Sequence, residues 1–362
     1  MSSPNVNHIS IKSNNNCSNV LLTLMLMISI MSCNKAELSV APISALINEE
    51  KSGDATTLIG DNGDVQTITQ SGFVLMGGGT DVDEAFKWMI DRSGGGDFVV
   101  IRATGTNAYD SYIYGLGTVN SVETIIINSV TKANKANIEK KIKNAEALFI
   151  AGGDQYDYVK YWKNTKVEDA INYLINTKHV PVGGTSAGCA ILGEVYFSAQ
   201  FGTITSTQAL NNPYNQKVAL GKSDFINIPI LSQTITDTHF DNPDRRGRST
   251  TFLARMVQDF GMAAKGIACE EKTAVCIDAN NIATVFGYNN GTAFFMKPTG
   301  LGPEVCVPNT KLTWNRSNQA VKVYKIENEI NGNGSFDLND WSTASGGTWV
   351  YFWVDNGVFH EN

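Results

Sequence analysis

The chain has 362 residues, of which 42% are hydrophobic and 9% aromatic, and these values are typical of a globular protein with a large core. The formal net charge of -7 and the lack of a run of lysine or arginine argue against a surface that binds nucleic acid. We therefore expect a small or peptidic substrate.

The first segment of the chain predicts export. Residues 20–31 form an apolar stretch with the length of a signal-peptide core, too short to span a bilayer as a helix. Cys33 follows in a context that resembles a bacterial lipobox, so we predict a signal peptide over residues 1–33 with Cys33 as the lipidated residue. The protein would then lie in the periplasm or at the cell surface and contact the membrane only through this anchor. An uncleaved anchor or plain secretion are the alternatives. Residues 34–65 are polar and predict a tether.

Strand-like and helix-like segments alternate from residue 66 onward. Short apolar runs predict buried strands, and apolar residues at a period near 3.6 predict helices. Alternation of this kind predicts an α/β fold with a doubly wound, mostly parallel sheet that binds ligands at the carboxyl ends of its strands. The expected strands are 72–79, 97–101, 122–128, 145–150 and 180–184, and the expected helical segments are 81–93, 108–116 (a short helix or ordered loop), 134–143 and 156–177.

The pattern is less regular beyond residue 192. We expect a loop at 203–220, a strand entering 237–240, a helix at 249–260, a hairpin of 266–269 with 274–277, and strands at 283–288 and 292–296. We assign residues 66–300 to the main domain. Residues 301–362, rich in aromatic and β-branched residues after position 322, are assigned to a C-terminal β extension.

Ser186 is the candidate nucleophile. It lies in the sequence GGTSAG at 183–188, between an expected strand and an apolar helix start, which is the setting of a nucleophile elbow. A sharp strand-to-helix turn tolerates only small neighbours, here Gly184 and Gly188. The N–H of Ala187 would then point toward an oxyanion formed at the turn.

A serine nucleophile needs a base, and the chain has four histidines. His8 lies in the predicted signal peptide, and His360 is close to the chain end. His179 begins the strand that leads to Ser186 and so falls at the opposite edge of the sheet. His239 remains. A carboxylate should orient its imidazole, and sequence order leaves both Asp237 and Glu271 open for this role.

Two other glycine-rich strand ends, 77–79 and 152–153, are expected at the same rim as Ser186. Neither continues as GxGxxG or GK[ST], so we predict no cofactor. No CxxC pair with histidines at metal spacing occurs, and we predict no metal site. Cys269 and Cys276 flank a polar turn, which allows a local disulfide, although free core thiols are the favoured interpretation.

Four motifs together resemble cyanophycinase and the wider serine peptidase family S51, which includes aspartyl dipeptidases. They are GGTSAG at 183–188, GGDQ at 152–155, DxHF at 237–240 with RRGR at 245–248, and GIxxxExTA at 266–274. The resemblance covers roughly residues 70–300. It implies a class I glutamine amidotransferase-like fold in which serine replaces the nucleophilic cysteine.

By matched position, the resemblance implies Ser186 as nucleophile, His239 as base and Glu271 as the third member. It also implies an oxyanion hole from the N–H groups of Gly153 and Ala187. The substrate pocket would be lined by Gln155, Asp237, Arg245 and Arg248.

The chain departs from the cyanophycinase pattern at Thr238, where that pattern has glutamine, and at Pro243, where it has arginine. These departures put cyanophycin itself in question as substrate. We predict an exported serine exopeptidase that hydrolyses aspartyl peptide or β-aspartyl isopeptide bonds through an acyl-enzyme on Ser186. The expected partners are a peptide containing Asp, with or without Arg, and a second copy of the chain in a homodimer. The alternatives are a catalytically inactive, lipid-anchored peptide-binding protein and an amidase or esterase for small substrates.

Overall fold

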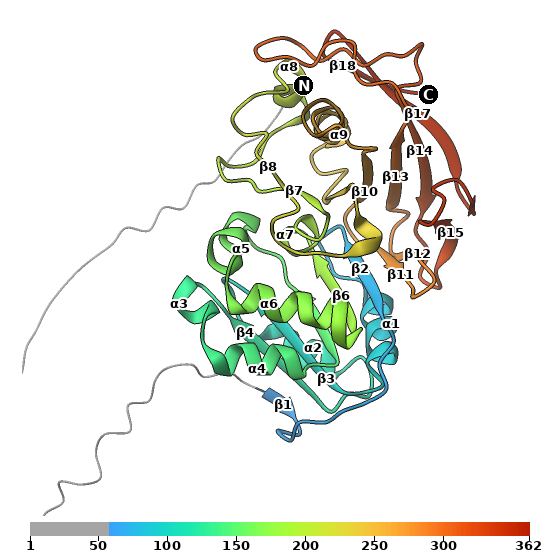
Figure 1. Ribbon diagram of the computed structural model, residues 1–362. Coiled ribbons are helices and arrows are strands. Elements are labelled where there is room, and N and C mark those ends of the chain that lie inside the picture. The colour runs from blue at the N-terminus through green and yellow to red at the C-terminus, as the bar shows by residue number, and fades with distance from the viewer. Residues whose placement is uncertain (1–57) are drawn as a thin grey trace, which may run out of the picture. The chain divides into compact units, whose positions relative to one another are not determined.

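Two mixed β-sheets organise residues 58–362, the part of the chain that the computed structural model describes (Figure 1). The predicted signal peptide, Cys33 and most of the predicted tether lie outside these residues. Strand β1 (Leu58–Gly60) falls within the expected tether, because it pairs antiparallel with β4 (Ser121–Ile126) and so joins the folded part of the chain.

The first sheet has ten strands in the order β1-β4-β3-β5-β6-β2-β11-β12-β15-β16. Its centre, from β4 to β2, is a run of parallel strands, and the strands on either side of this run pair antiparallel. The parallel strands carry almost unbroken apolar sequences because helices cover both of their faces. The remaining bounds are β2 (Gly72–Met76), β3 (Asp97–Arg102), β5 (Ala147–Ile150), β6 (Pro181–Thr185), β11 (Thr273–Ile277), β12 (Ile282–Gly287), β15 (Asn333–Asp337) and β16 (Ala344–Ser345).

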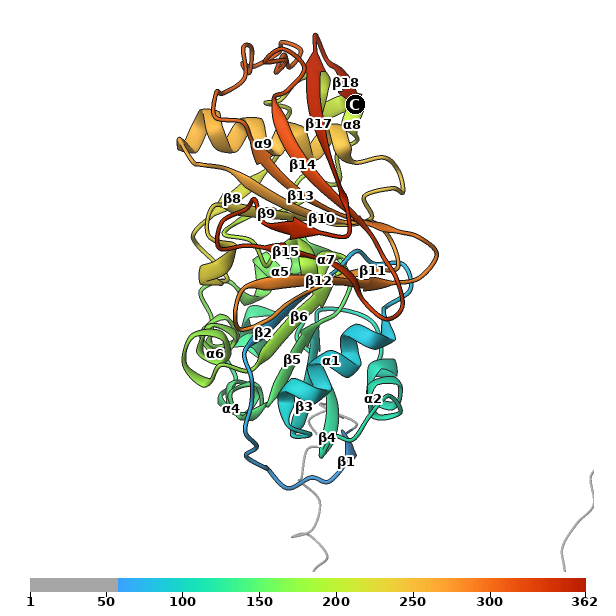
Figure 2. The same ribbon diagram turned by 90° about the vertical axis from the view of Figure 1, so that its right-hand side faces the viewer.

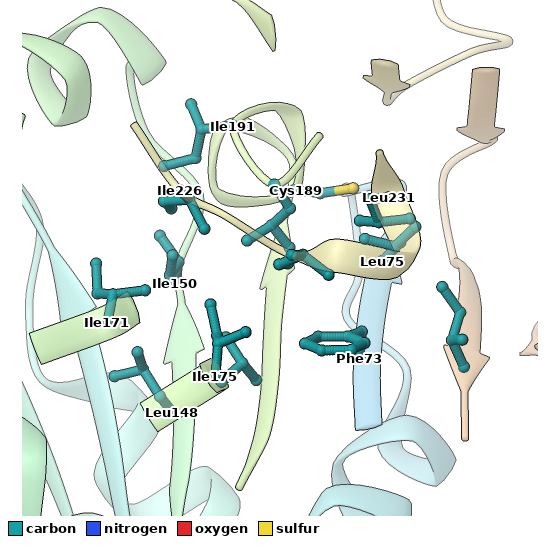
Figure 3. Packing of buried hydrophobic residues seen from close by; sticks show 14 of the residues in the cluster. Phe73, Leu75, Leu148, Ile150, Ile171, Ile175, Cys189, Ile191, Ile226 and Leu231 are labelled. Carbon is teal, nitrogen blue, oxygen red and sulfur yellow. The ribbon is translucent and has the colours of Figure 1, made fainter. Parts of the chain in front are cut away.

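Helices lie on opposite sides of the parallel strands. Figure 2 shows α1 (Asp83–Ser93) and α2 (Ala108–Tyr114) on one side, with α4 (Ala136–Asn144) and α6 (Lys166–Tyr173) on the other. Figure 3 shows part of the core beneath the second set, where Leu75, Leu148 and Ile171 are buried together. The short α3 (Val130–Ala133) precedes α4, and α5 (Gln155–Trp162) precedes α6. The predicted α/β, doubly wound arrangement is confirmed, with antiparallel flanks in addition.

The second sheet has eight strands in the order β18-β17-β14-β13-β10-β9-β7-β8. Helix α9 (Arg246–Phe260) shares a buried apolar cluster with it, through Phe252, Leu253 and Met256. The strand bounds are β7 (Val195–Phe197), β8 (Leu220–Lys222), β9 (Thr234–Asp237), β10 (Lys265–Cys269), β13 (Thr292–Pro298), β14 (Val321–Glu327), β17 (Thr348–Asp355) and β18 (Val358–Glu361).

The expected hairpin of residues 266–269 with 274–277 is wrong. Strand β10 pairs with β9 and β13 in the second sheet, whereas β11 pairs with β2 and β12 in the first. Each strand thus has a partner along both of its edges, which leaves no free edge on which the two could pair with each other. The turn between them therefore connects the two sheets.

Two further expectations differ from the structure. The predicted loop at 203–220 contains helix α8 (Ser206–Asn211), which begins with a capping box between Thr205 and Gln208. The C-terminal segment does not form one separate layer, because β14, β17 and β18 extend the second sheet while β15 and β16 extend the first. The segment beyond residue 300 is thus built into both sheets.

Candidate active site

Ser186 lies on a sharp turn between β6 and the short helix α7 (Ala187–Ala190). Its backbone has φ 52° and ψ -119°, a strained conformation for a residue with a side chain. The turn packs tightly, since a Cβ atom at Gly188 would lie 2.0 Å from the carbonyl oxygen of Ile150. The GxSxG spacing therefore produces the strand-turn-helix arrangement that a nucleophile elbow requires.

The structure places Ser186, His239 and Glu271 in one chain of hydrogen bonds. Ser186 Oγ lies 2.8 Å from His239 Nε2, and His239 Nδ1 lies 2.7 Å from Glu271 Oε1. His239 follows β9, and its backbone N–H donates to the carbonyl oxygen of Gly77 over 2.8 Å. Of the two carboxylates that sequence order left open, Glu271 is the one that contacts the imidazole.

Glu271 lies in the turn between β10 and β11, and a residue of the segment that follows His239 holds this turn in place. The backbone N–H of Glu271 donates to Asp241 Oδ1 over 3.0 Å. Asp241 is two residues beyond His239, so the segment that carries His239 and the turn that carries Glu271 are also connected by this side-chain-to-backbone hydrogen bond. The sequence did not single out Asp241, since nothing local marks this acidic residue as different from others in a loop.

Glycine-rich strand ends surround Ser186, as predicted from the parallel strand order. Gly78 has φ +94°, and a Cβ atom there would lie 2.5 Å from His239 Nε2 and 3.1 Å from Ser186 Cβ. A Cβ atom at Gly152 would lie 3.4 Å from Ser186 Cβ. The ends of β2, β5 and β6 thus meet at one rim, and only glycine fits at Gly78 beside the imidazole.

A cavity of about 340 Å³ lies beside Ser186. Gly153 and Ala187, the two expected sources of oxyanion N–H groups, both line it, as does Gln155, whose side-chain amide donates to the carbonyl oxygen of Phe197 over 3.4 Å. The remaining lining residues are Asp154, Ser186, Ala199, Gly202, Thr203, Thr238, His239, Arg245 and Arg248. Of these, Thr203 begins the segment predicted as a loop, whereas Ala199 and Gly202 fall in no predicted element.

Asp237 does not line this cavity, contrary to expectation. It is buried, and Arg248 pairs with it through both Nη2 and Nε, the latter over 3.1 Å to Oδ2. Burial acts to raise the pKa of the Asp237 carboxyl, but the charge and hydrogen bonds of Arg248, with a hydrogen bond from Ser249, lower it overall. Asp237 therefore holds Arg248 in place instead of facing a ligand.

Arg245 is the cavity's other cation, and its surroundings differ from those of Arg248. Its Nη1 donates to the carbonyl oxygen of Thr238 over 2.9 Å. No carboxylate between residues 58 and 362 forms an ion pair with it. Burial and the nearby charge of Arg248 lower the pKa of Arg245 to about 10, so the guanidinium is still charged at neutral pH. Arg245 is thus the lining cation that is available to an anionic group.

The four cysteines in the described part of the chain are buried thiols. Cys189, Cys269, Cys276 and Cys306 are free, so the local disulfide between Cys269 and Cys276 does not form. Burial raises the pKa of the Cys189 thiol well above its ordinary value. In the described part of the chain no cluster of His, Cys, Asp and Glu side chains could hold a metal ion, and no helix there is long and apolar enough to cross a membrane.

Residues 73–285 match Peptidase family S51, which is more than half of the chain. Among curated proteins, the chain is 23% identical over 180 residues to a cyanophycinase of Nostoc sp., covering 50% of this chain and 54% of the relative. It is 24% identical over 149 residues to a cyanophycinase of Geminocystis herdmanii, covering 41% and 49%. The chain thus spans about half the length of the curated relatives it matches.

Two solved structures are also similar. A peptidase from an acI-B1 Actinobacterium aligns with a TM-score of 0.45 at 16% identity, covering 62% of this chain and 91% of that one. A putative peptidase E protein from Listeria monocytogenes aligns with a TM-score of 0.41 at 16% identity, covering 61% and 100%. On the match over residues 73–285, which contains Ser186, His239 and Glu271, the chain belongs to peptidase family S51.

Proposed function

We propose that the protein is a serine peptidase that cleaves aspartyl peptide or β-aspartyl isopeptide bonds through an acyl-enzyme on Ser186. The observation that carries the proposal is the hydrogen-bond chain from Ser186 Oγ through His239 to Glu271 at a strained strand-to-helix turn. A nucleophile, a base and an orienting carboxylate in this order are the components of acyl transfer by serine.

In the proposed mechanism, Glu271 accepts a hydrogen bond from Nδ1–H of His239, which leaves Nε2 free to accept the Ser186 proton. Ser186 Oγ then attacks the scissile carbonyl carbon. The resulting oxyanion would be stabilised by the N–H groups of Ala187 and Gly153, with the positive end of the short α7 segment adding to the field. His239 passes its proton to the leaving amine, and the acyl-enzyme remains.

Deacylation reverses these roles. Water takes the place of the amine, His239 removes its proton, and the hydroxide attacks the acyl carbon. When the second tetrahedral intermediate collapses, the proton returns to Ser186 Oγ and the carboxylic acid product leaves. The cavity beside Ser186 is lined by Gln155 and Thr238, polar groups that can contact the product.

The proposal of an aspartyl substrate rests on charge in the cavity. Arg245 offers a guanidinium that forms no ion pair within the described chain, although Asp237, Glu271 and Asp241 act on it from a distance. A substrate carboxylate would supply a direct partner. Arg248 also lines the cavity, but Asp237 already neutralises it. A substrate with one carboxylate near the scissile bond fits this arrangement better than one whose recognition needs two unpaired arginines. The relatives named cyanophycinase support the aspartyl class in general.

The test is release of free amino groups from cyanophycin, β-Asp-Arg and matched α- and β-aspartyl peptides, with wild type and Ser186→Ala side by side. We expect turnover on at least one aspartyl peptide, lost in the variant, and no turnover on peptides in which Asn replaces Asp. Binding of peptide that survives Ser186→Ala, with no turnover by the wild type, would instead support a peptide-binding protein. Turnover of simple amides or esters alone would support an amidase or esterase.

We also propose that Cys33 carries a lipid and anchors the exported protein to a membrane. The support is the apolar segment before Cys33 and its lipobox-like context. Incorporation of radiolabelled palmitate by the full chain when it is expressed in a bacterium, lost in Cys33→Ala, is the expected result. Incorporation that is equal in both chains would contradict the proposal.

A further inference from the structure

Arg246 lies beside the candidate site but does not line its cavity. It is the first residue of α9, directly after the cavity residue Arg245 and two residues before Arg248. Its guanidinium faces Phe294 of β13, with 5.6 Å between its central carbon and the ring centre. The side chain is 27% exposed. Arg246 therefore extends away from the cavity and into the space between α9 and the second sheet.

Three acidic side chains from three segments surround this guanidinium. Nη2 lies 3.5 Å from Glu270 Oε1 in the β10–β11 turn, and Nε lies 3.6 Å from Glu361 Oε2 in β18. Nη1 lies 3.6 Å from Asp244, which is 56% exposed. Glu270 and Glu361 are the better shielded partners, so their ion pairs with Arg246 are less weakened by solvent.

Both shielded partners are themselves held. Glu361 Oε1 accepts a hydrogen bond from Lys325 of β14 over 2.7 Å. Glu270 Oε2 accepts from the backbone N–H of Thr292 over 2.8 Å, and the Glu270 N–H donates to the carbonyl oxygen of Thr292 over 3.0 Å. Arg246 thus connects two fixed points, the C-terminal strand and the turn that carries Glu271.

The position of Glu270 gives this connection a consequence for the site. Glu270 directly precedes Glu271, and a shift of its backbone moves the carboxylate that orients His239. Arg246 also directly follows Arg245 and begins the helix that carries Arg248. Its guanidinium contacts Glu270, in the turn that carries Glu271, and Glu361, in β18. Strand β18 lies outside residues 73–285, the part of the chain that matches the family.

We propose that Arg246 is a positioning residue that couples the C-terminal strand β18, through Glu361, to Glu271 and hence to the imidazole of His239. This inference rests on the proposed function of Ser186, His239 and Glu271. It gives the C-terminal strand a part in catalysis although it contributes no side chain to the cavity. A displacement of about 1 Å in a catalytic group can lower the rate by roughly 100-fold. Loss of one supporting ion pair should displace Glu271 by less than this, so we expect the reaction rate of Ser186 to fall on the order of tenfold.

The variants are Arg246→Met, Glu361→Gln and the double variant. Arg246→Lys keeps the charge and is the conservative variant. Arg316→Met is the matched control, since Arg316 is 28% exposed, lies in the same C-terminal segment as Glu361 and pairs with Glu304 over 3.4 Å, away from the cavity. Thermal unfolding of each purified variant separates a loss of folding from a loss of positioning.

The readout is the second-order rate at which a small alkyl fluorophosphonate modifies Ser186, followed by intact mass. In this reaction Ser186 Oγ bonds to phosphorus, fluoride leaves, and His239 takes the hydroxyl proton, so the rate reports the triad without any peptide contact. We expect rates on the order of tenfold below wild type for Arg246→Met and Glu361→Gln, a rate for the double variant close to that of Arg246→Met, and partial recovery in Arg246→Lys. Arg316→Met should react like the wild type.

Folded variants that react at the wild-type rate would overturn the positioning role, as would losses that simply add in the double variant. Losses in Arg316→Met equal to those in Arg246→Met would show a general effect of the C-terminal region and would also overturn it. A wild type that does not react with the fluorophosphonate would overturn the proposed nucleophile, and the positioning role with it.

Discussion

Replacement of Gly78 by alanine tests whether the site depends on close approach of the backbone to the imidazole. A Cβ atom at this position would lie 2.5 Å from His239 Nε2, whereas non-bonded atoms of this size need about 3.5 Å. Either the imidazole or the β2 end must therefore move by about 1 Å. Because Ser186 Cβ is only 3.1 Å from the same point, the serine is crowded as well.

A misplacement of this size costs roughly 100-fold in rate, or about 2.7 kcal/mol of transition-state stabilisation. The φ of +94° at Gly78 adds backbone strain of about 1–2 kcal/mol, which lowers stability irrespective of the imidazole. The control is Gly300→Ala, because Gly300 has φ +120° and a Cβ atom there would meet no neighbouring atom of the described chain within 4 Å. The two variants thus share the strain and differ in the contact.

The assay is the rate of Ser186 modification by a fluorophosphonate, together with thermal unfolding. We expect Gly78→Ala to react on the order of 100-fold more slowly than wild type and Gly300→Ala to react at the wild-type rate. Both variants should lose stability through the backbone strain, and Gly78→Ala should lose more because the overlap with the imidazole adds to it. A Gly78→Ala protein that is folded and reacts at the wild-type rate would refute the reasoning, because the imidazole would then tolerate a side chain at this position.

Three further predictions concern single side chains of the site. Glu271→Gln keeps the shape of the side chain but disfavours the His239 tautomer that has its proton on Nδ1. We therefore expect kcat to fall roughly 10³- to 10⁴-fold in a steady-state assay. An unchanged kcat would exclude the orienting role of Glu271. Arg245→Met should raise KM for an aspartyl peptide at least roughly tenfold, with a smaller effect on kcat. The control is Arg255→Met in helix α9, because Arg255 pairs with Asp259, and this variant should leave both KM and kcat unchanged. Equal effects of the two substitutions would contradict a substrate contact by Arg245. Asp237→Asn leaves Arg248 buried without its counter-charge and should cost about 3–5 kcal/mol in urea unfolding at pH 7. The pKa of Asp237 in the folded protein lies below its ordinary 3.8, so the ion pair contributes its full free energy of unfolding above pH 3.8 and loses it as the pH falls through the lowered pKa. The difference in unfolding free energy between wild type and Asp237→Asn should therefore shrink in strong acid. A difference that stays constant with pH would argue against the ion pair.

The parallel centre of the fold was predictable from sequence because its strands are short, fully buried apolar runs separated by helices of clear period. Residues 147–150 and 181–185 are buried throughout, and such runs occur where helices cover both faces of a sheet. The order of the carboxyl ends then follows from the alternation of strands and helices. For the same reason the meeting of the glycine-rich strand ends at Ser186 was predictable from the sequence alone.

Strand partners farther away were not predictable in the same way. The short turn between 265–269 and 273–277 fits a hairpin. Local sequence does not show that the two strands belong to different sheets, where each pairs with other strands on both of its edges. The same limit applies to Asp237. Its position two residues before His239 suggested a place in the site, but its environment is decided by Arg248, which returns to it from the first turn of α9.

The choice between Asp237 and Glu271 shows the limit most clearly. Both are acidic residues near His239 in sequence or in an expected turn, and the residues alone could not separate them. The family resemblance favoured Glu271, and the structure places its carboxylate 2.7 Å from His239 Nδ1. Supporting contacts such as Asp241 to the Glu271 N–H arise only when β9 and β10 are parallel neighbours, which is a property of the whole sheet.

The central claim is that Ser186 becomes covalently acylated by an aspartyl peptide during turnover. The most direct measurement is rapid acid quench of the enzyme with its best aspartyl peptide, followed by peptide mapping by mass spectrometry. We predict a mass increase equal to the acyl part of the substrate on the peptide that contains Ser186, formed in a burst and absent from Ser186→Ala. Turnover that persists in Ser186→Ala, or proceeds in the wild type with the acyl group on another residue, would contradict the claim.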